Sequence, residues 1–175
     1  RILTSATSTL EIPEFTGIRE PFILDYLEEN KAPQGLTCNI VKSVNKDKLS
    51  ALFQLLCHLG GESTLVFCNH RDAAKRVSDS LSESLVVNEY FHGGLDQQIR
   101  ERVLGKFRNG SCNILVCTDL ASRGLDIPDV KHVIHYHLPA NEAAYTHRNG
   151  RTARMHAAGD SYLILSADEI VPAYI

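Results

Sequence analysis

Three arginines at regular spacing are the residues of this chain most suited to chemistry. Arg148, Arg151 and Arg154 lie at intervals of three in AYTHRNGRTARMHAAG, with His147 before them and Gly150 among them. On a helix, like charges at this spacing repel by about 0.2–0.5 kcal/mol per pair, and an interior glycine costs about 1 kcal/mol relative to alanine. Guanidinium groups make paired hydrogen bonds to phosphate oxygens, so a phosphate ligand would explain the stretch. A solvated or acid-paired surface helix is the alternative.

The elements that must position these arginines form an alternating series. Apolar runs typical of strands alternate with stretches of helical periodicity, and Asp96 is expected to cap one helix. The predicted strands cover 36–42, 64–68, 85–92, 112–118, 130–138 and 161–166, and the predicted helices cover 45–60, 70–83, 96–110 and a segment that begins at Asn141. Such alternation predicts an α/β fold, with an open, mostly parallel sheet and helices on both faces.

Ligands bind such sheets beyond the carboxyl ends of the strands, so the residues that follow each strand are informative. Polar, cationic or glycine-bearing segments follow four of them, in NHR, HGGLDQQIR, TDLASRGLDIP and the arginine stretch. Each has a plain alternative: a simple turn, a solvated helix start, or a local salt-bridge cluster of Asp119, Arg123 and Asp126. Their expected placement along one edge favours a shared phosphate-binding function.

The bulk properties describe an ordinary globular chain. It has 175 residues with a net charge of −3, so a basic surface for nucleic acid must be local. Five cysteines without C-x-x-C spacing predict reduced, buried thiols in a cytoplasmic protein, and no metal site is expected. No membrane span is expected either, because no apolar run approaches the length that a span needs. Residues 1–36 are predicted to be the tail of a preceding domain plus a linker, and 37–175 the domain itself.

The motifs at the strand ends resemble those of the second RecA-like domain of DEAD-box RNA helicases. TD-x-x-x-RG-x-D is similar to motif V of that family, and H-R-x-G-R-x-x-R within the arginine stretch is similar to motif VI. HGGLDQQIR is similar to the H-G plus Q-x-x-R element, TLVFCNHRD to motif IV, and the opening S-A-T to motif III. The resemblance covers essentially the whole chain in the right order and implies a RecA-like fold.

The resemblance also implies roles for the matching residues. Arg151 and Arg154 would be arginine fingers on the γ-phosphate of ATP, and His147 and Arg148 would couple this site to the first domain and to the attacking water. The other implied residues are Gly124 and Asp126 for ATP, Asn69, Arg71, Gly93, Gln97, Arg100 and Thr118 for the RNA backbone, and Ser5, Thr7 and Arg123 for interdomain coupling.

The sequence departs from the family pattern at three positions. The family usually has H-R-I-G-R-T-G-R, where this chain has Asn149 for the isoleucine and Ala153 for the second glycine. His137 stands where the family has the acid of Y-D-x-P. These departures leave every phosphate-facing arginine in place.

The chain contains neither a G-x-x-x-x-G-K-[ST] phosphate loop nor a D-E-A-D motif, which in the family belong to the first domain. It is therefore expected to be half of an ATP-dependent RNA helicase, inactive alone, with Mg²⁺ held by the N-terminal RecA-like domain. The alternatives are a superfamily-2 DNA helicase domain and a non-catalytic RNA-binding or interaction module. A dinucleotide fold is disfavoured because no G-x-G-x-x-G follows a strand.

Overall fold

The computed structural model describes residues 14–17, 35–119, 130–153 and 158–175. The chain divides into two units, Arg1–Ala32 and Pro33–Ile175. In the first unit, the described part is the 3-10 helix η1 (Glu14–Thr16) with the glycine that follows it. Every other element described below belongs to the second unit. The domain boundary predicted from the sequence, between residues 36 and 37, stays a prediction.

The described strands form one sheet of six, in the order β1-β6-β5-β2-β4-β3, and every neighbouring pair is parallel. The strands are β1 (Leu36–Lys42), β2 (Thr64–Cys68), β3 (Glu89–Phe91), β4 (Ile114–Thr118), β5 (His132–His135) and β6 (Gly159–Leu165). The central strands β2, β4 and β5 are buried at every position. Burial on both faces explains why they are continuous apolar runs in the sequence, and the predicted parallel α/β sheet is confirmed.

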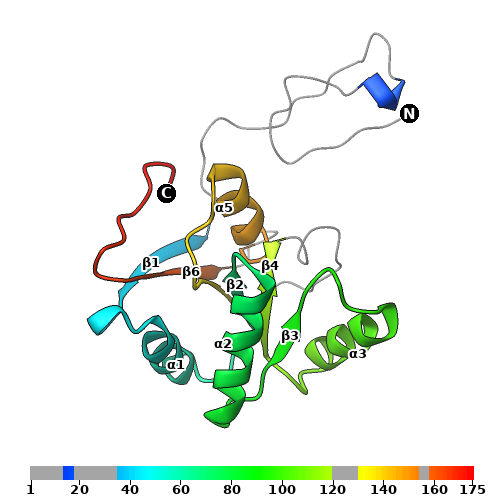
Figure 1. Ribbon diagram of the computed structural model, residues 1–175, viewed down its shortest axis with the longest axis horizontal. Helices are drawn as coiled ribbons and strands as arrows, with labels where there is room; N and C mark the ends of the chain where they lie inside the picture. The colour runs from blue at the N-terminus through cyan, green and yellow to red at the C-terminus, as the bar shows by residue number, and fades with distance from the viewer. Residues whose placement is uncertain (1–13, 18–34, 120–129, 154–157) are drawn as a thin grey trace. The chain divides into compact units, whose positions relative to one another are not determined.

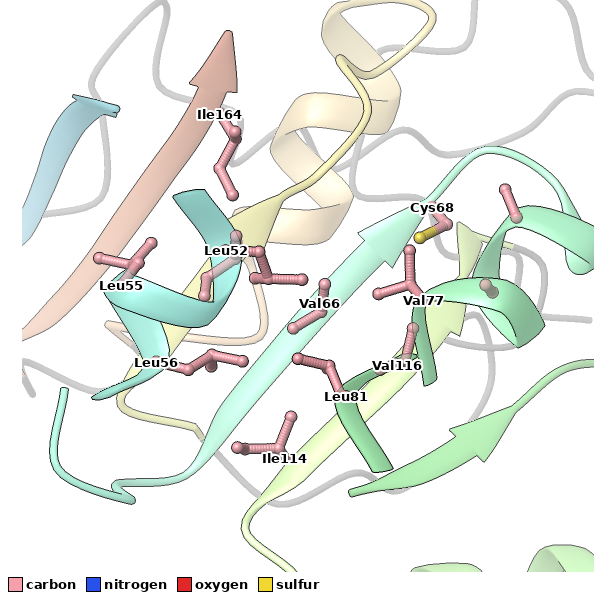
Figure 2. Packing of buried hydrophobic residues seen from close by; sticks show 13 residues of the cluster. Leu52, Leu55, Leu56, Val66, Cys68, Val77, Leu81, Ile114, Val116 and Ile164 are labelled. Atoms are coloured by element: carbon pink, nitrogen blue, oxygen red, sulfur yellow. The ribbon is translucent and has the colours of Figure 1, made fainter. Parts of the chain in front are cut away.

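Helices cover both faces of this sheet (Figure 1). The described helices are η2 (Val44–Lys46), α1 (Lys48–His58), α2 (Arg71–Glu83), α3 (Gln97–Arg108) and α5 (Glu142–Asn149). On one face, α1 and α2 contribute Leu52, Val77 and Leu81 to a cluster that includes Val66 and Val116 of the sheet (Figure 2). Among the described residues, no helix has the length and apolar character needed to cross a bilayer.

The second face carries a separate cluster under α3. Phe107 of α3 packs with Leu65 and Phe67 of β2 and with Leu115 of β4. Asp96 stands at the expected cap position of α3, but its carboxylate makes no capping hydrogen bond to the helix. Both faces of β2 and β4 are therefore closed, which leaves the strand ends as the places where polar side chains gather.

The strand predicted over 85–92 is shorter than expected, because its first half is a turn. Leu85 has a φ of +61°, which an extended strand does not permit, and its side chain is 91% exposed. The side-chain amide of Asn88 donates to the carbonyl oxygens of Ser78 and Val86 and so fastens the turn to the end of α2. Only 89–91 pair with β4.

The arginine stretch is not one helix, so the repulsion and glycine cost calculated for a helix do not apply. α5 begins after Asn141, whose side chain accepts from the Ala144 amide, and it ends at Asn149. Gly150 lies at the C-cap, where a Cβ would come within 3.2 Å of the carbonyl oxygen of Thr146. Arg148 is therefore helical, whereas Arg151 lies in the turn that follows.

The prediction of five buried thiols is wrong for two of them. All five cysteines are free, but Cys38 and Cys57 are exposed, while Cys68, Cys112 and Cys117 are buried. Cys38 lies on β1, which is at the edge of the sheet that the described strands form, and its Sγ is 3.2 Å from the Tyr145 hydroxyl. A β-rich run alone does not distinguish an edge strand from a central one.

Candidate functional site

The register of the sheet brings several predicted site residues to one edge. Thr118 at the end of β4 pairs with Cys68 at the end of β2, and Phe67 of β2 pairs with His135 at the end of β5. The segments that begin at Asn69 and Asp119 consequently leave the sheet side by side. The expectation that the strand ends share one edge is confirmed for these described residues.

Arg148 is the centre of this edge, and its guanidinium lies inside the protein. The residue is fully buried, and its Nε and Nη2 donate to the two carboxylate oxygens of Asp119 at 2.6 and 2.8 Å. Nη2 also donates to Oδ1 of Asn69 at 2.8 Å, and Nη1 donates to the carbonyl oxygen of His137 at 2.8 Å. The guanidinium carbon lies 5.2 Å from the centre of the Phe67 ring.

This arrangement gives Arg148 a fixed set of partners from three segments of the domain, which follow or end β2, β4 and β5. A buried, bidentate and charge-assisted pair of this kind is strong and directional. Asp119 does take part in a salt bridge, and its partner among the described residues is Arg148, 29 residues further along the chain. The local cluster with Arg123 and Asp126 stays a prediction, because both of those residues lie outside the described part of the chain. Arg148 therefore holds α5 against the ends of β2 and β4.

His137 and Asn69 complete the ring of contacts. Burial, followed by the nearby Lys48 ammonium, lowers the pKa of His137, which favours a neutral ring. A neutral ring can accept at Nδ1, and that atom lies 3.3 Å from the amide nitrogen of Asn69, which donates. The Asn69 side chain donates in turn to the carbonyl oxygen of Leu138. His137 thus has a clear role at the position where the resemblance expects an acid.

The turn after α5 presents Arg151, which is half-buried. The Arg151 amide donates to the carbonyl oxygen of Arg148, and the Thr152 amide donates to that of Asn149. The carbonyl oxygen of Arg151 accepts from the Val130 amide at 3.0 Å. The backbone of Arg151 is therefore fixed on both sides, so its side chain starts from a defined position.

Two further residues restrict the end of this turn. Ala153 has a φ of +54°, a left-handed conformation that favours glycine, which is the residue that the family usually has here. A Cβ on Gly159 would lie 2.0 Å from Oγ1 of Thr152 and 2.7 Å from the amide nitrogen of Ala153. Only a glycine at the start of β6 allows the turn to approach so closely.

His147 lies on α5 immediately before the buried arginine. It is half-buried, and its Nδ1 has no hydrogen-bond partner among the residues that the structure describes. This Nδ1 is buried and unpaired, which is compatible with the coupling role that the resemblance implies for His147. The structure brings His147, Arg148 and Arg151 together within one helix end and its turn.

The candidate RNA residues gather mainly around the turn between β3 and α3. The Tyr90 hydroxyl donates to the carbonyl oxygen of Arg71, and the Tyr90 ring lies 4.7 Å from that of His92. Nδ1 of His92 accepts from the Gly94 amide. A Cβ on Gly94 would lie 3.1 Å from Nη1 of Arg71, so the guanidinium of Arg71 reaches this turn from α2.

Gln97 and Arg100 follow on the first turns of α3. Gln97 is exposed and donates to the Glu101 carboxylate at 2.8 Å, while the Arg100 guanidinium lies 5.9 Å from the centre of the Phe91 ring. Gly93 is exposed, and no atom lies within 4 Å of the place a Cβ would take. Asn69 and Thr118 belong instead to the Arg148 side of the edge, where Thr118 is buried.

The remaining predicted site residues lie outside the described part of the chain. They are Ser5, Thr7, Arg123, Gly124, Asp126 and Arg154. Within the described ranges, no group of three or more histidine, cysteine, aspartate or glutamate side chains is arranged to hold a metal ion.

Sequence reasoning missed a second layer of polar residues behind Arg148. His135, Asn149 and Ser161 are all buried and hydrogen-bonded to one another. The HVIH run reads as an apolar strand with a histidine at each end, and nothing in it indicates that His135 faces α5. The one available signal was Asn149 itself, as a polar residue in place of the family's isoleucine.

Comparison with known proteins identifies the family. The model of the helicase conserved C-terminal domain matches residues 47–156. The chain belongs to this family. The expected resemblance to DEAD-box RNA helicases is confirmed as well, because the chain is 38% identical over 173 residues to DEAD-box ATP-dependent RNA helicase 53 of rice. That alignment covers 96% of this chain and 29% of the rice protein, so the chain spans under a third of that relative's length.

Solved structures of DEAD-box proteins share the fold of this helicase domain. The E. coli DEAD-box protein SrmB, bound to regulator of ribonuclease activity A, matches with a TM-score of 0.68 and 30% identity over 79% of this chain and 80% of that one. Yeast Dbp5, bound to RNA and ADP BeF3, matches with a TM-score of 0.71 and 27% identity over 78% of this chain and 37% of that one. The predicted RecA-like architecture is therefore confirmed.

Proposed function

We propose that this helicase domain is the second RecA-like domain of an ATP-dependent RNA helicase and that Arg151 acts as an arginine finger. Phosphoryl transfer needs positioning and charge neutralisation more than covalent chemistry. The observation that carries the proposal is the turn after α5, which fixes the Arg151 backbone beside a buried arginine–carboxylate pair. Arg154 would be the second finger on the γ-phosphate of ATP.

In this proposal Arg148 contributes through position and not through direct contact with ATP. Four of its five N–H groups bind Asp119, Asn69 and the carbonyl oxygen of His137. The fifth, on Nη1, faces Nδ1 of His135 at 3.4 Å, so no donor is directed to a ligand without breaking one of these contacts. It sets the place of α5 and hence of the turn. His147, whose buried Nδ1 has no hydrogen-bond partner among the described residues, is the residue of this helix end that would couple to the first domain.

ATP is the substrate, and its phosphates and Mg²⁺ would be held chiefly by the N-terminal RecA-like domain. Gly124 and Asp126 would approach the nucleotide from this domain, with Asp126 accepting from a ribose hydroxyl. Ser5, Thr7 and Arg123 would couple the two domains. Because the phosphate loop belongs to the other domain, we expect the isolated chain to hydrolyse no ATP.

RNA would bind along the same edge, chiefly through the β3–α3 turn. Arg71, Gly93, Gln97 and Arg100 offer cationic, amide and open backbone groups that suit the sugar–phosphate backbone. Such contacts carry no sequence information and weaken with salt. Asn69 and Thr118 would have a supporting role, because the Asn69 amide is already bound within the domain.

The finger proposal is tested by RNA-stimulated ATP hydrolysis in the full-length protein. Arg151→Ala should lower the turnover by about 10³-fold or more, the scale of an arginine finger. Arg151→Lys should recover little, because an ammonium does not reproduce the planar fork. Lys75→Ala, an exposed cation on α2 with an Asp79 partner, is the matched control and should leave turnover unchanged. Wild-type turnover in Arg151→Ala would refute the finger assignment.

The choice of nucleic acid is tested separately by duplex unwinding. The full-length protein should separate a short RNA duplex in the presence of ATP and should fail on a DNA duplex of the same sequence. Equal unwinding of both would favour the DNA-helicase alternative. A cytoplasmic location stays a prediction, which imaging of the full-length protein would test.

A further inference from the structure

A buried polar triad lies directly behind Arg148. Asn149 is 2% exposed, and His135 and Ser161 are fully buried. The Ser161 hydroxyl donates to Oδ1 of Asn149 at 2.9 Å, and Nε2 of His135 lies 3.1 Å from the same oxygen. The three residues come from α5, β5 and β6, so they join the helix to two strands of the sheet.

The geometry determines how the His135 ring is protonated. Oδ1 of Asn149 can only accept, so Nε2 of His135 must carry the hydrogen. In the neutral ring, Nδ1 is then an acceptor, and it faces Nη1 of Arg148 at 3.4 Å. A second proton on Nδ1 would point at that guanidinium.

The surroundings of His135 agree with a neutral ring. Burial and, secondarily, the Arg148 charge lower the pKa of His135 to about 3. The ring lies 6.4 Å from that of Phe67 and 5.3 Å from that of Tyr145 between ring centres, so aromatic groups cover it from β2 and α5. A line of contacts consequently runs from Asp119 through Arg148 and His135 to Asn149.

We propose that Asn149, His135 and Ser161 are positioning residues for Arg148 and for the turn that presents Arg151. Asn149 acts at both ends: its side chain binds the triad, and its carbonyl oxygen accepts from the Thr152 amide that closes the turn. The inference rests on the proposed finger role of Arg151, but the triad itself is testable without it. It also gives Asn149 a role at the position where the family has isoleucine. Isoleucine would remove the acceptor of the Ser161 hydroxyl and would leave Nε2 of His135 with Ser161 Oγ, at 3.2 Å, in place of Oδ1.

The tautomer is tested on the 175-residue chain by long-range proton–nitrogen NMR of the histidine rings. Between pH 5 and 8, His135 should show one neutral form with the hydrogen on Nε2. In Asn149→Ile the Nε2 hydrogen should keep only Ser161 Oγ as acceptor, so its proton and nitrogen signals should shift, whereas Asn149→Asp, which keeps an acceptor oxygen, should retain the wild-type signals. A hydrogen on Nδ1, or protonation of His135 within this range in the wild type, would overturn the proposal.

The positioning role is tested in the full-length protein by steady-state ATP hydrolysis with RNA. Asn149→Ile should lower kcat about tenfold and change the KM for ATP less than twofold, because a finger acts on the transition state and not on ground-state binding. Asn149→Asp should stay within threefold of the wild type. Retention of the wild-type kcat in Asn149→Ile would overturn the proposal.

A matched pair of serine variants separates positioning from general loss of packing. Ser161→Ala and Ser78→Ala each remove a buried hydroxyl that donates to an asparagine Oδ1, at 2.9 and 2.6 Å, but Ser78 lies on α2 with Asn88 as its partner. Ser161→Ala should lower kcat about threefold, and Ser78→Ala should not. Equal losses would overturn the proposal. A wild-type protein without RNA-stimulated hydrolysis would instead refute the proposed function and leave the NMR result as the test of the triad.

Discussion

Replacement of Arg148 by methionine should lower the free energy of unfolding of this chain by about 3 kcal/mol. Methionine keeps much of the length of the side chain but removes every donor, so Asp119, Asn69 and the carbonyl oxygen of His137 lose their shared partner. Removal of one partner from a buried ion pair costs about 3–5 kcal/mol. The lower end applies, because the Asp119 side chain is 27% exposed and can recruit water.

The origin of this loss can be isolated with a second substitution. Asp119→Asn in the Arg148→Met background removes the unpaired carboxylate, so the double variant should regain about 1–2 kcal/mol over the single one. Lys75→Met is the matched control, since it breaks an ion pair of similar length between side chains that are more than half exposed. Exposed pairs contribute little, so its unfolding midpoint should match the wild type.

Urea unfolding followed by far-UV circular dichroism measures all four proteins at pH 7. The slope of free energy against urea should stay constant, so that the differences come from the midpoints. A loss below about 1 kcal/mol in Arg148→Met would refute the reasoning that Arg148 holds α5 to the sheet. So would a double variant that regains nothing over Arg148→Met.

Three further outcomes can be measured on the same chain. In urea titrations Gly159→Ala should lower the free energy of unfolding by about 2–3 kcal/mol through overpacking, since its methyl group would lie 2.0 Å from a threonine oxygen. Gly105→Ala, on the open surface of α3, should raise it by about 0.5–1 kcal/mol. The opposite order would contradict the geometry. The folded-state pKa of His135, about 3, lies below its unfolded value, so its contribution to the free energy of unfolding is complete above about pH 6.5 and is lost as the pH falls toward 3. Between pH 6.5 and 5 the wild type should lose about 1 kcal/mol of unfolding free energy per pH unit more than His135→Gln. Parallel plots of unfolding free energy against pH for the two proteins would contradict this. With Ellman's reagent, Cys38 and Cys57 should react in the native chain, and the three buried cysteines only after unfolding; rapid reaction of a third thiol would show that the interior is open.

The sequence was sufficient to predict the parallel sheet and the edge that carries the site. The runs at 64–68 and 114–118 are apolar at nearly every position because both of their faces are covered, and such runs alternate with helices in a way that few folds allow. The polar residues after each run then fall on one edge by topology alone. These inferences need only local patterns and the geometry of parallel strands.

The different positions of Arg148, buried on α5, and Arg151, in the turn after it, could not be predicted from local patterns. Gly150 looks like the interior of a helix, but the helix ends there, so Arg148 faces inward and Arg151 leaves on a turn. The partner that decides this, Asp119, is 29 residues away. Likewise, Leu85 resembles the start of a strand, and only its positive φ reveals a turn. Long-range contacts, which the sequence does not display, override these local preferences.

The pairing of β1 with β6 has a consequence for the way the domain folds. Of the described strands, β1 is the first in the sequence and β6 is the last, yet they are neighbours in the sheet. The bond from the Ser43 hydroxyl to the carbonyl oxygen of Leu165 joins residues 122 positions apart. Contacts of such separation form slowly, and during synthesis from the N-terminus β1 has no sheet neighbour until β6 has been made. The turn that carries Arg151 abuts the first residue of β6, so its geometry is completed only in that late step. Until then the nascent chain exposes an unpaired strand edge, which is the kind of surface that chaperones bind.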